Sequence, residues 1–339
     1  MVRHFQMRNR EKKFPGCKPD GPGVYCRKVS QKKQIGGRNQ MKKIDLTEKY
    51  YRGCAGSCVR MSKELQECFN SPHGIYLRVQ CQSGVRICFS TDAREMVFSM
   101  VFGDAVRQVF ASDLFIDGKM TTLTGEGPHR IELAEGGKNI TIHLPHLVLI
   151  NKVELAVNDG AEVTPLPRPE KTILFCGDSI MQGMTTTSPA LAPAPRIAAG
   201  LNMDFINTSF GGAKMNPEHI RLTALLPGDI MIVALGTNDS LSKKPLDIFT
   251  ADVRESLKIF AVFPGRKYLI LPIPNPGAEP GLDEYRRIIR TEAETYPEIR
   301  IIDGYEFYPA DLEYYCDKTH PNDRGAELYA RHVVEIIGA

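Results

Sequence analysis

From residue 74 to residue 163, short runs of alternating apolar and polar residues are separated by turn residues. Such alternation predicts antiparallel strands with one buried face, at 75–81, 85–90, 114–119, 130–133 and 139–144. Asp117-Gly118 and Gly136-Gly137 predict tight turns between strands. Because the strands follow one another without an intervening helix, the pattern predicts a β-sandwich of the jelly-roll type over residues 46–163.

After residue 171 the hydrophobic period changes. Apolar runs that fit buried strands occur at 172–176, 203–207, 230–235, 267–271 and 299–302. Between them, apolar residues recur at helical spacing, as in Phe249, Val253, Leu257 and Phe260. Alternating strands and helices predict a parallel sheet with helices on both faces. Five strands with right-handed crossovers give a three-layer, flavodoxin-like α/β domain over residues 172–339.

A length of 339 residues also favours two domains over one. The three prolines within residues 164–171 predict an extended linker between them. Hydrophobic residues make up 42% of the chain, but no run approaches the roughly 20 apolar residues that a membrane-spanning helix needs. The composition therefore predicts two packed cores and no membrane partner.

The start of the chain differs from the rest in charge. Residues 1–40 hold 11 Lys and Arg against 2 Asp and Glu, which leaves the remaining chain with 32 basic and 38 acidic residues. This acidic balance argues against a nucleic-acid partner for the folded part. The leader could be a basic arm for nucleic acid or anionic lipid, but it lacks the apolar core of a secretory signal. We favour a disordered leader over residues 1–45, or a segment upstream of a true start at Met41.

Nine cysteines are spread along the chain. Without an export signal, they are expected to be reduced thiols of a cytoplasmic protein. Cys54, Cys58 and Cys68 could be imagined as zinc ligands, but their spacing lacks the paired short gaps of zinc sites, so buried, inert thiols are favoured. A proline between His143 and His146 removes the helical geometry of an H-x-x-H metal site and favours a half-buried strand with its polar residues outward.

Polar loops at 177–179, 207–212 and 236–239 follow three of the predicted parallel strands. Ligands bind at this carboxyl edge in open α/β sheets. Ser179 taken alone could equally be a helix N-cap. Asp317 and His320 lie three residues apart before the last helix, where the carboxylate can take the imidazole Nδ1–H and leave Nε2 as a general base. Together, Ser179, His320 and Asp317 predict a nucleophile, its base and the acid that orients the base.

A serine nucleophile also needs preorganised donors for the oxyanion of its tetrahedral intermediate. The candidates are the Ser179 amide, the amide of a glycine at 211 or 212, and the side-chain amide of Asn238. Glycine suits this loop because it lets the backbone approach the oxyanion closely. Asp178 and Asp239 are interpreted as loop-structuring residues that accept hydrogen bonds from nearby amides.

These segments resemble the sequence blocks of the SGNH or GDSL hydrolase superfamily, at 177–179, 211–212, 236–239 and 317–320. The resemblance covers about residues 170–339, and the signature residues that it implies are Ser179, Gly212, Asn238 and His320. Gly212 is preferred to Gly211 because the family's second block commonly reads Phe-Ser-Gly, which residues 210–212 match with their last glycine. The β domain resembles, more loosely, the N-terminal sandwich of the two-domain SGNH enzymes that make up the second carbohydrate esterase family. Some of those relatives lack the triad aspartate, whereas Asp317 implies a full triad here.

The sequence therefore predicts a serine esterase that removes short acyl groups, foremost O-acetyl, from a carbohydrate, with no metal or organic cofactor. A general short-chain carboxylesterase, an acyltransferase and an inactive ligand-binding protein remain as alternatives. Phe210 and Tyr308 could stack on a sugar ring or pack in the core. The segment 184–200 is expected to form a long loop and one wall of the pocket. The expected partner is a small or oligosaccharide ester, and the oligomeric state stays open.

Overall fold

The second half of the chain is built on a five-stranded parallel sheet. The computed structural model describes residues 40–70, 75–277 and 281–338, and this sheet has the order β12-β11-β13-β14-β15. Its strands are β11 (Thr172–Gly177), β12 (Asp204–Asn207), β13 (Ile230–Ala234), β14 (Arg266–Ile270) and β15 (Ile299–Ile302). Every neighbouring pair is parallel, so the predicted five-stranded α/β fold is confirmed.

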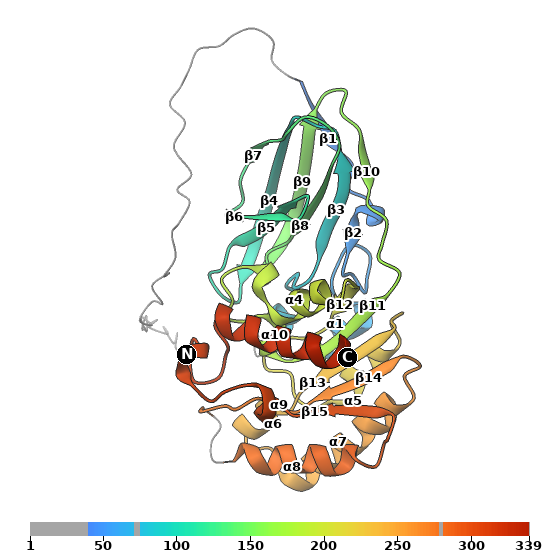
Figure 1. Cartoon of the computed structure of the whole chain (residues 1–339), viewed down its shortest axis with the longest axis vertical. Coiled ribbons are helices and arrows are strands. Elements are labelled where there is room, and N and C mark those ends of the chain that lie inside the picture. Colours follow the sequence, from blue (N-terminus) through green and yellow to red (C-terminus); the bar gives the residue numbers. More distant parts are fainter. Residues whose placement is uncertain (1–39, 71–74, 278–280, 339) are drawn as a thin grey trace, which may run out of the picture. The chain divides into compact units, whose positions relative to one another are not determined.

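Helices cover both faces of this sheet, with α4 and α10 on one side and α7 and α8 on the other (Figure 1). Successive residues of a strand point to opposite faces. Leu174 and Cys176 accordingly join the core beneath α7 and α8, while Ile173 and Phe175 join the core beneath α4 and α10. The helices of this half are α3 (Ser179–Gln182), η2 (Pro189–Leu191), α4 (Pro193–Gly200), α5 (Pro217–Ala224), α6 (Thr237–Leu241), α7 (Leu246–Ala261), α8 (Leu282–Ala293), α9 (Gly304–Phe307), η3 (Leu312–Tyr314) and α10 (Asp323–Gly338).

Two antiparallel sheets form the first half. One has the order β1 (Met41–Ile44), β9 (Val148–Asn158), β4 (Glu95–Ala105) and β7 (His129–Glu132). The other has the order β10 (Val163–Pro165), β3 (Arg86–Thr91), β8 (Lys138–His143), β5 (Ala111–Ile116) and β6 (Lys119–Thr124). A short strand, β2 (Tyr51–Arg52), follows the 3-10 helix η1 (Glu48–Tyr50) and also pairs with β3. Phe89 and Ile140 from one sheet share a core with Phe98 and Leu155 from the other. The predicted β-rich domain is confirmed.

The expected strand at 75–81 is instead helix α2 (Ile75–Gln80), which follows α1 (Lys63–Cys68). Short apolar runs fit either the strand or the helix period, so packing decides between them. Val79 is buried with Met61 and Leu65 in the core beneath α7 and α8, not in the sandwich core. The strand prediction was wrong because this segment leaves the sandwich and packs against the α/β half.

Other expected boundaries also shift in the structure. Met41–Ile44, which the sequence assigned to the leader, pairs with β9 as β1, because an extended segment there satisfies its backbone groups in the ladder. Residues 1–39 of the expected leader lie outside the described residues. Val163–Pro165, where the linker was expected to begin, pairs with β3 as β10. The 184–200 segment is not one long loop, since it contains η2 and α4.

A buried ion pair joins the two halves. Arg86 Nη2 of β3 lies 2.8 Å from Asp204 Oδ1 of β12, and the Arg86 guanidinium lies 3.8 Å from the centre of the Phe205 ring. The described residues accordingly form one compact unit. Within them, every helix is too short or too polar to cross a lipid bilayer.

Candidate active site

Ser179 follows the interior strand β11 through a tight turn. Asp178 caps α3, since its Oδ1 accepts a hydrogen bond from the Ile180 amide at 2.9 Å. A Cβ at Gly177 would lie 2.9 Å from Met181 Cβ, so the close packing of strand against helix requires glycine there. The turn places Ser179 at the first residue of α3, with 6% of its surface exposed.

His320 lies on the turn before α10 and faces Ser179. Its Nε2 is 2.9 Å from Ser179 Oγ, and its Nδ1 is 2.9 Å from Asp317 Oδ2. Partial burial pulls the pKa of Asp317 upward, but hydrogen bonds from the His320 ring and from the amides of His320 and Thr319 outweigh it and lower that pKa to about 2. Asp317 is therefore ionised at neutral pH and holds the imidazole with Nδ1–H toward itself and Nε2 toward the serine.

The loop after β12 carries the predicted glycine donor. Gly212 has a φ of +86°, in the left-handed region that favours glycine. The Gly211 amide donates to Gln182 Oε1 at 2.6 Å, whereas the amides of Ser179 and Gly212 donate to no acceptor in the described part of the chain. This difference leaves Gly212, and not Gly211, able to donate to a substrate oxygen.

Asn238, half-buried at the start of α6, is tied to the same loop. Its Nδ2 donates to Ala213 O at 2.9 Å. A carboxamide nitrogen carries two hydrogens, so one remains for a substrate oxygen. The structure thus brings the three predicted oxyanion donors to one edge of the sheet, with Ser179 on α3, Gly212 after β12 and Asn238 after β13.

The two aspartates predicted to structure loops are both buried. Asp178 is the cap of α3, and burial raises its pKa to about 6. Asp239 accepts the Met215 amide at 2.8 Å and pairs with Lys244 at 3.2 Å. Burial raises the pKa of Asp239, and its bonds to Met215 and Lys244 partly offset that rise. Both carboxylates therefore contact backbone of the strand-end loops.

Sequence reasoning missed three residues that hold the predicted oxyanion loop (residues 207–213). Gln182, on α3, accepts the Gly211 amide through Oε1 and donates to Arg78 O through Nε2 at 2.9 Å. The buried Arg60 donates to the carbonyls of Asn207 and Ser209, and Arg78 Nη1 donates to Gly211 O at 2.9 Å. No local motif marks Arg60 or Arg78, because their partners in this loop lie 133 to 149 residues away. Only the place of Gln182 three residues after Ser179 could have pointed to it.

Several other candidates lie in the interior. Phe210 and Tyr308 are 1% and 2% exposed, so both pack in the core rather than present a face to a sugar. The expectation of outward-facing histidines is wrong: His143 and His146 are buried, and His146 Nε2 lies 2.9 Å from Gly183 O. Their strand end packs against α3 and its neighbours, which removes it from solvent. The thiols of Cys54, Cys58 and Cys68 are free, but the expectation that they are buried is wrong, because Cys68 is exposed and the other two are only partly buried. Among the described residues, no group of three His, Cys, Asp or Glu side chains is arranged to hold a metal ion.

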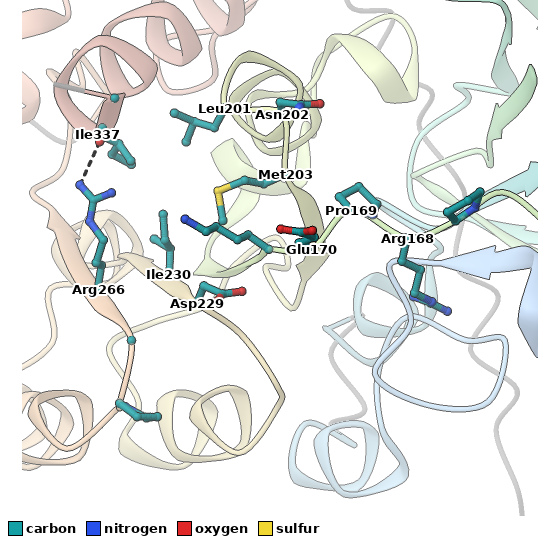
Figure 2. Close-up of a pocket in the computed structure, with 15 residues that line it drawn as sticks. Arg168, Pro169, Glu170, Leu201, Asn202, Met203, Asp229, Ile230, Arg266 and Ile337 are labelled. Carbon is teal, nitrogen blue, oxygen red and sulfur yellow. Dashed lines mark hydrogen bonds between the residues drawn. The ribbon is translucent and has the colours of Figure 1, made fainter.

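A wide groove of about 880 Å³ lies at the opposite, amino-terminal edge of the parallel sheet. Figure 2 shows Arg168, Glu170, Asp229 and Arg266 along it, and Arg266 Nη2 donates to Ile337 O at 2.9 Å. These charges are of mixed sign, and the residues that line the groove include neither a serine nor a histidine. The groove is therefore separate from the Ser179 site.

Residues 175–328 match the sequence model of the GDSL-like Lipase/Acylhydrolase family. A comparison with curated protein sequences found no significant match. The matched segment contains Ser179, Gly212, Asn238, Asp317 and His320.

Solved structures share the whole two-part fold. The chain is similar to the salicylyl-acyltransferase SsfX3 from a tetracycline biosynthetic pathway, at 20% identity and a TM-score of 0.73, over 88% of this chain and 98% of that one. It is similar to a family two carbohydrate esterase from Cellvibrio japonicus, at 14% identity and a TM-score of 0.58, over 88% and 97% of the two chains. A family two carbohydrate esterase from Clostridium thermocellum, solved with cellohexaose, matches at 15% identity and a TM-score of 0.56, over 75% and 92%. At these identities the likeness shows the fold.

Proposed function

Since residues 175–328 match the sequence model of the GDSL-like Lipase/Acylhydrolase family, we propose that the protein is a serine esterase that removes O-acetyl or other short acyl groups from carbohydrates. The observation that carries the proposal is the position of His320 between two side chains. Its Nε2 lies 2.9 Å from Ser179 Oγ, and its Nδ1 lies 2.9 Å from the Asp317 carboxylate. This is the geometry of a nucleophile, a general base and an orienting acid.

In the acylation step, Ser179 Oγ attacks the ester carbonyl while His320 Nε2 takes the hydroxyl proton. The imidazolium that forms is stabilised by Asp317, whose low pKa keeps it ionised. The tetrahedral intermediate places its oxyanion among the Ser179 amide, the Gly212 amide and the Asn238 side chain. Collapse of the intermediate expels the alcohol, which receives the proton from His320 and leaves an acyl group on Ser179.

Deacylation repeats the sequence with water. His320 takes a proton from water as it attacks the acyl-enzyme, and the same three donors hold the second oxyanion. Collapse returns the proton to Ser179 Oγ and releases the acid. Each donor to the oxyanion is worth about 10²–10³ in turnover in enzymes of this kind.

The carbohydrate part of the proposal rests on the similarity to family two carbohydrate esterases, which extends over both halves of the chain. A second candidate, acyl transfer to an alcohol other than water, is supported by the similarity to the salicylyl-acyltransferase. The two functions share the acyl-enzyme and differ in the acceptor. Assays with different acyl acceptors are therefore needed to distinguish the esterase from the acyltransferase.

The test is acetate release from a panel of acetylated sugars, beside p-nitrophenyl acetate and esters of longer acids. Wild type is compared with Ser179→Ala and with Ser90→Ala, an exposed hydroxyl on the sandwich as the matched control. Acetate release that vanishes only in Ser179→Ala supports the esterase. Ester formation with an added alcohol in place of acid release supports the transferase, and turnover that survives in Ser179→Ala contradicts both.

We also propose a cytoplasmic location. The buried thiols of Cys81, Cys88 and Cys176 are free, as are those of Cys54, Cys58 and Cys68. Free thiols persist in a reducing compartment. Thiol titration of denatured protein prepared without reductant tests this, and the presence of disulfides would contradict it.

A further inference from the structure

We infer that Arg78 forms a subsite for an anionic group of the ester substrate, beside the oxyanion loop. The inference rests on the proposed esterase function and specifies the charge of its substrate. It goes beyond the triad and the oxyanion donors because Arg78 comes from helix α2, in the segment that connects the sandwich strands β2 and β3.

The Arg78 guanidinium lies against the glycine that is free to donate to a substrate. Nη1 of Arg78 donates to Gly211 O at 2.9 Å. A Cβ built on Gly212 would lie 2.9 Å from the same Nη1, and no other described atom outside the two adjacent residues lies within 4 Å. Apart from those adjacent residues, the described group nearest to the space beside Gly212 is therefore positively charged.

The backbone of Arg78 is fixed from two sides. Arg60 Nη2 donates to Arg78 O at 2.6 Å and to Val79 O at 2.8 Å. Gln182 Nε2 donates to Arg78 O at 2.9 Å. Because Gln182 lies on α3, three residues after Ser179, these bonds hold the end of α2 against the helix that carries the nucleophile. The backbone from which the Arg78 side chain extends is thus fixed, and the bond to Gly211 O holds its guanidinium beside the oxyanion loop.

The charge of Arg78 has no acidic partner among the described residues. The side chain is half-buried, makes one hydrogen bond, to a carbonyl, and forms no ion pair in the part of the chain that the structure describes. Its pKa is lowered by burial and by the positive charge of Arg107, on the connection between β4 and β5. A half-buried guanidinium that forms no ion pair with the described residues and lies near a second positive charge favours an anion.

A guanidinium has five N–H donors, and the bond to Gly211 O uses one of them. The remaining donors match the planar, bidentate geometry of a carboxylate, and they also suit a phosphate or sulfate. The anionic group can belong to the acyl part or to the alcohol part of the ester. An acidic sugar would carry it on the alcohol side.

Two pairs of esters of matched size test the inference. For the acyl side, 4-nitrophenyl hemisuccinate is compared with 4-nitrophenyl butyrate. For the alcohol side, 4-acetoxybenzoate is compared with 4-acetoxybenzamide. The measured quantity is the ratio of kcat/KM for the charged ester to that for the neutral ester, in wild type, Arg78→Gln and Arg78→Lys. Arg254→Gln, a surface guanidinium paired with Glu292 on α8, is the control and is expected to behave as wild type.

In wild type we expect the charged ester of at least one pair to be preferred by about tenfold or more, the size of a charge-assisted hydrogen bond. Arg78→Gln should lower the ratio of kcat/KM for the charged ester to that for the neutral ester by about 10- to 100-fold. Arg78→Lys should retain part of the preference. Addition of 0.5 M salt to wild type should weaken it, because salt screens the charges. The pair that responds identifies the side of the ester that carries the charge.

Two results would overturn the inference: no preference for either charged ester in wild type, or an equal loss for charged and neutral esters in Arg78→Gln. The second result would mean that Arg78 only orders the loop through Gly211 O. A failure of the proposed function looks different, because then neither neutral ester is cleaved, or cleavage survives in Ser179→Ala.

Discussion

Gln182 Oε1 accepts the Gly211 amide at 2.6 Å, and this one hydrogen bond couples the nucleophile helix to the oxyanion loop. Since Gln182 is fully buried, the bond is shielded from water. It occupies the amide of Gly211 and leaves that of Gly212 free. The same side chain reaches Arg78 O, so a single residue aligns α3, the oxyanion loop and α2.

Gln182→Ala should therefore lower kcat by about 10- to 100-fold with a smaller change in KM, because it misplaces an oxyanion donor rather than a substrate contact. Gln182→Glu keeps an acceptor for the Gly211 amide but loses the donor to Arg78 O, and it should retain more activity than Gln182→Ala. Steady-state kinetics on a neutral acetyl ester measure both. An increase in KM at unchanged kcat would show that Gln182 acts on binding instead.

Removal of a triad member should abolish most turnover. Ser179→Ala and His320→Ala should each lower kcat by about 10⁴ or more, and the double variant should be no slower than the slower single one, because the two residues act as a unit. Asp317→Asn should lower kcat strongly, since the neutral amide cannot stabilise the imidazolium. Asp283→Asn, an exposed aspartate on α8, is the matched control. Additive losses in the double variant would contradict a shared mechanism.

Gly212→Ala tests the glycine donor, with Gly118→Ala as the control. Both glycines have a positive φ, +86° and +81°, so both substitutions strain the backbone by about 1 kcal/mol. A Cβ at 118 meets nothing within 4 Å, whereas a Cβ at 212 would lie 2.9 Å from Arg78 Nη1. We expect similar losses of free energy of unfolding, and a loss of turnover of about 100-fold only in Gly212→Ala. Equal activity in the two variants would show that turnover does not require the space beside the residue 212 amide to be free of a Cβ.

The closeness of the proposed nucleophile to its proposed base could be predicted because both lie in short motifs of defined spacing. Ser179 follows an apolar run and a glycine, and Asp317 and His320 share one turn, so local spacing defines their geometry. The parallel fold was equally predictable, because strand and helix periods alternate over residues 172–339.

The supports of the site could not be predicted in this way. Arg60 donates to Ser209 O, which lies 149 residues further along the chain. The sequence around Arg60 contains no motif that would predict this hydrogen bond. The apolar run of α2 is too short for its periodicity to distinguish a strand from a helix. Its helical conformation depends on packing against the α/β core, which the local sequence does not show. Outward histidines were expected from strand alternation, but His146 is buried against Gly183, in a contact between the two halves of the chain.

Buried histidines make the protein sensitive to acid. Burial, helped for His143 by the charge of Arg86, lowers the pKa of His143 to about 3, and burial lowers those of His146 and His219 to about 4. Unfolding returns these groups to a pKa of about 6.5, so three protons are taken up on unfolding between pH 6.5 and 4. Asp178, whose pKa burial raises to about 6, acts in the opposite direction and releases one proton between pH 6 and 4.

The free energy of unfolding should therefore fall as the pH is lowered from 6.5 to 4, by about 2–3 kcal/mol per pH unit in the middle of this range. Urea unfolding at pH 7, 6 and 5 measures it. His146→Gln, which can still donate to Gly183 O, should reduce the slope by about one proton. A free energy of unfolding that is constant over this range would contradict the neutral, buried state of the three histidines.

Arg60 connects the N-terminal half to the loop that carries the proposed glycine donor, and its substitution tests whether that connection affects turnover. The side chain is 1% exposed, and its two terminal nitrogens donate to four carbonyls, those of Arg78, Val79, Asn207 and Ser209. Burial lowers the pKa of Arg60 to about 10, so the guanidinium is still charged at neutral pH. Arg60→Met would leave these carbonyls without a donor and should cost at least about 3 kcal/mol of stability.

Arg60→Lys keeps the charge but replaces the planar fork by a compact ammonium group that cannot reach both loops at once. We expect kcat to fall about tenfold, with KM nearly unchanged, at a temperature well below the unfolding transition. Arg52→Lys is the control, since Arg52 also donates to two backbone carbonyls, those of Leu166 and Pro167, outside the active site. Arg52→Lys should lose stability without loss of kcat. If both lysine variants kept full kcat, the guanidinium of Arg60 would serve folding alone, and the oxyanion loop would be positioned by Gln182 without help from the N-terminal half.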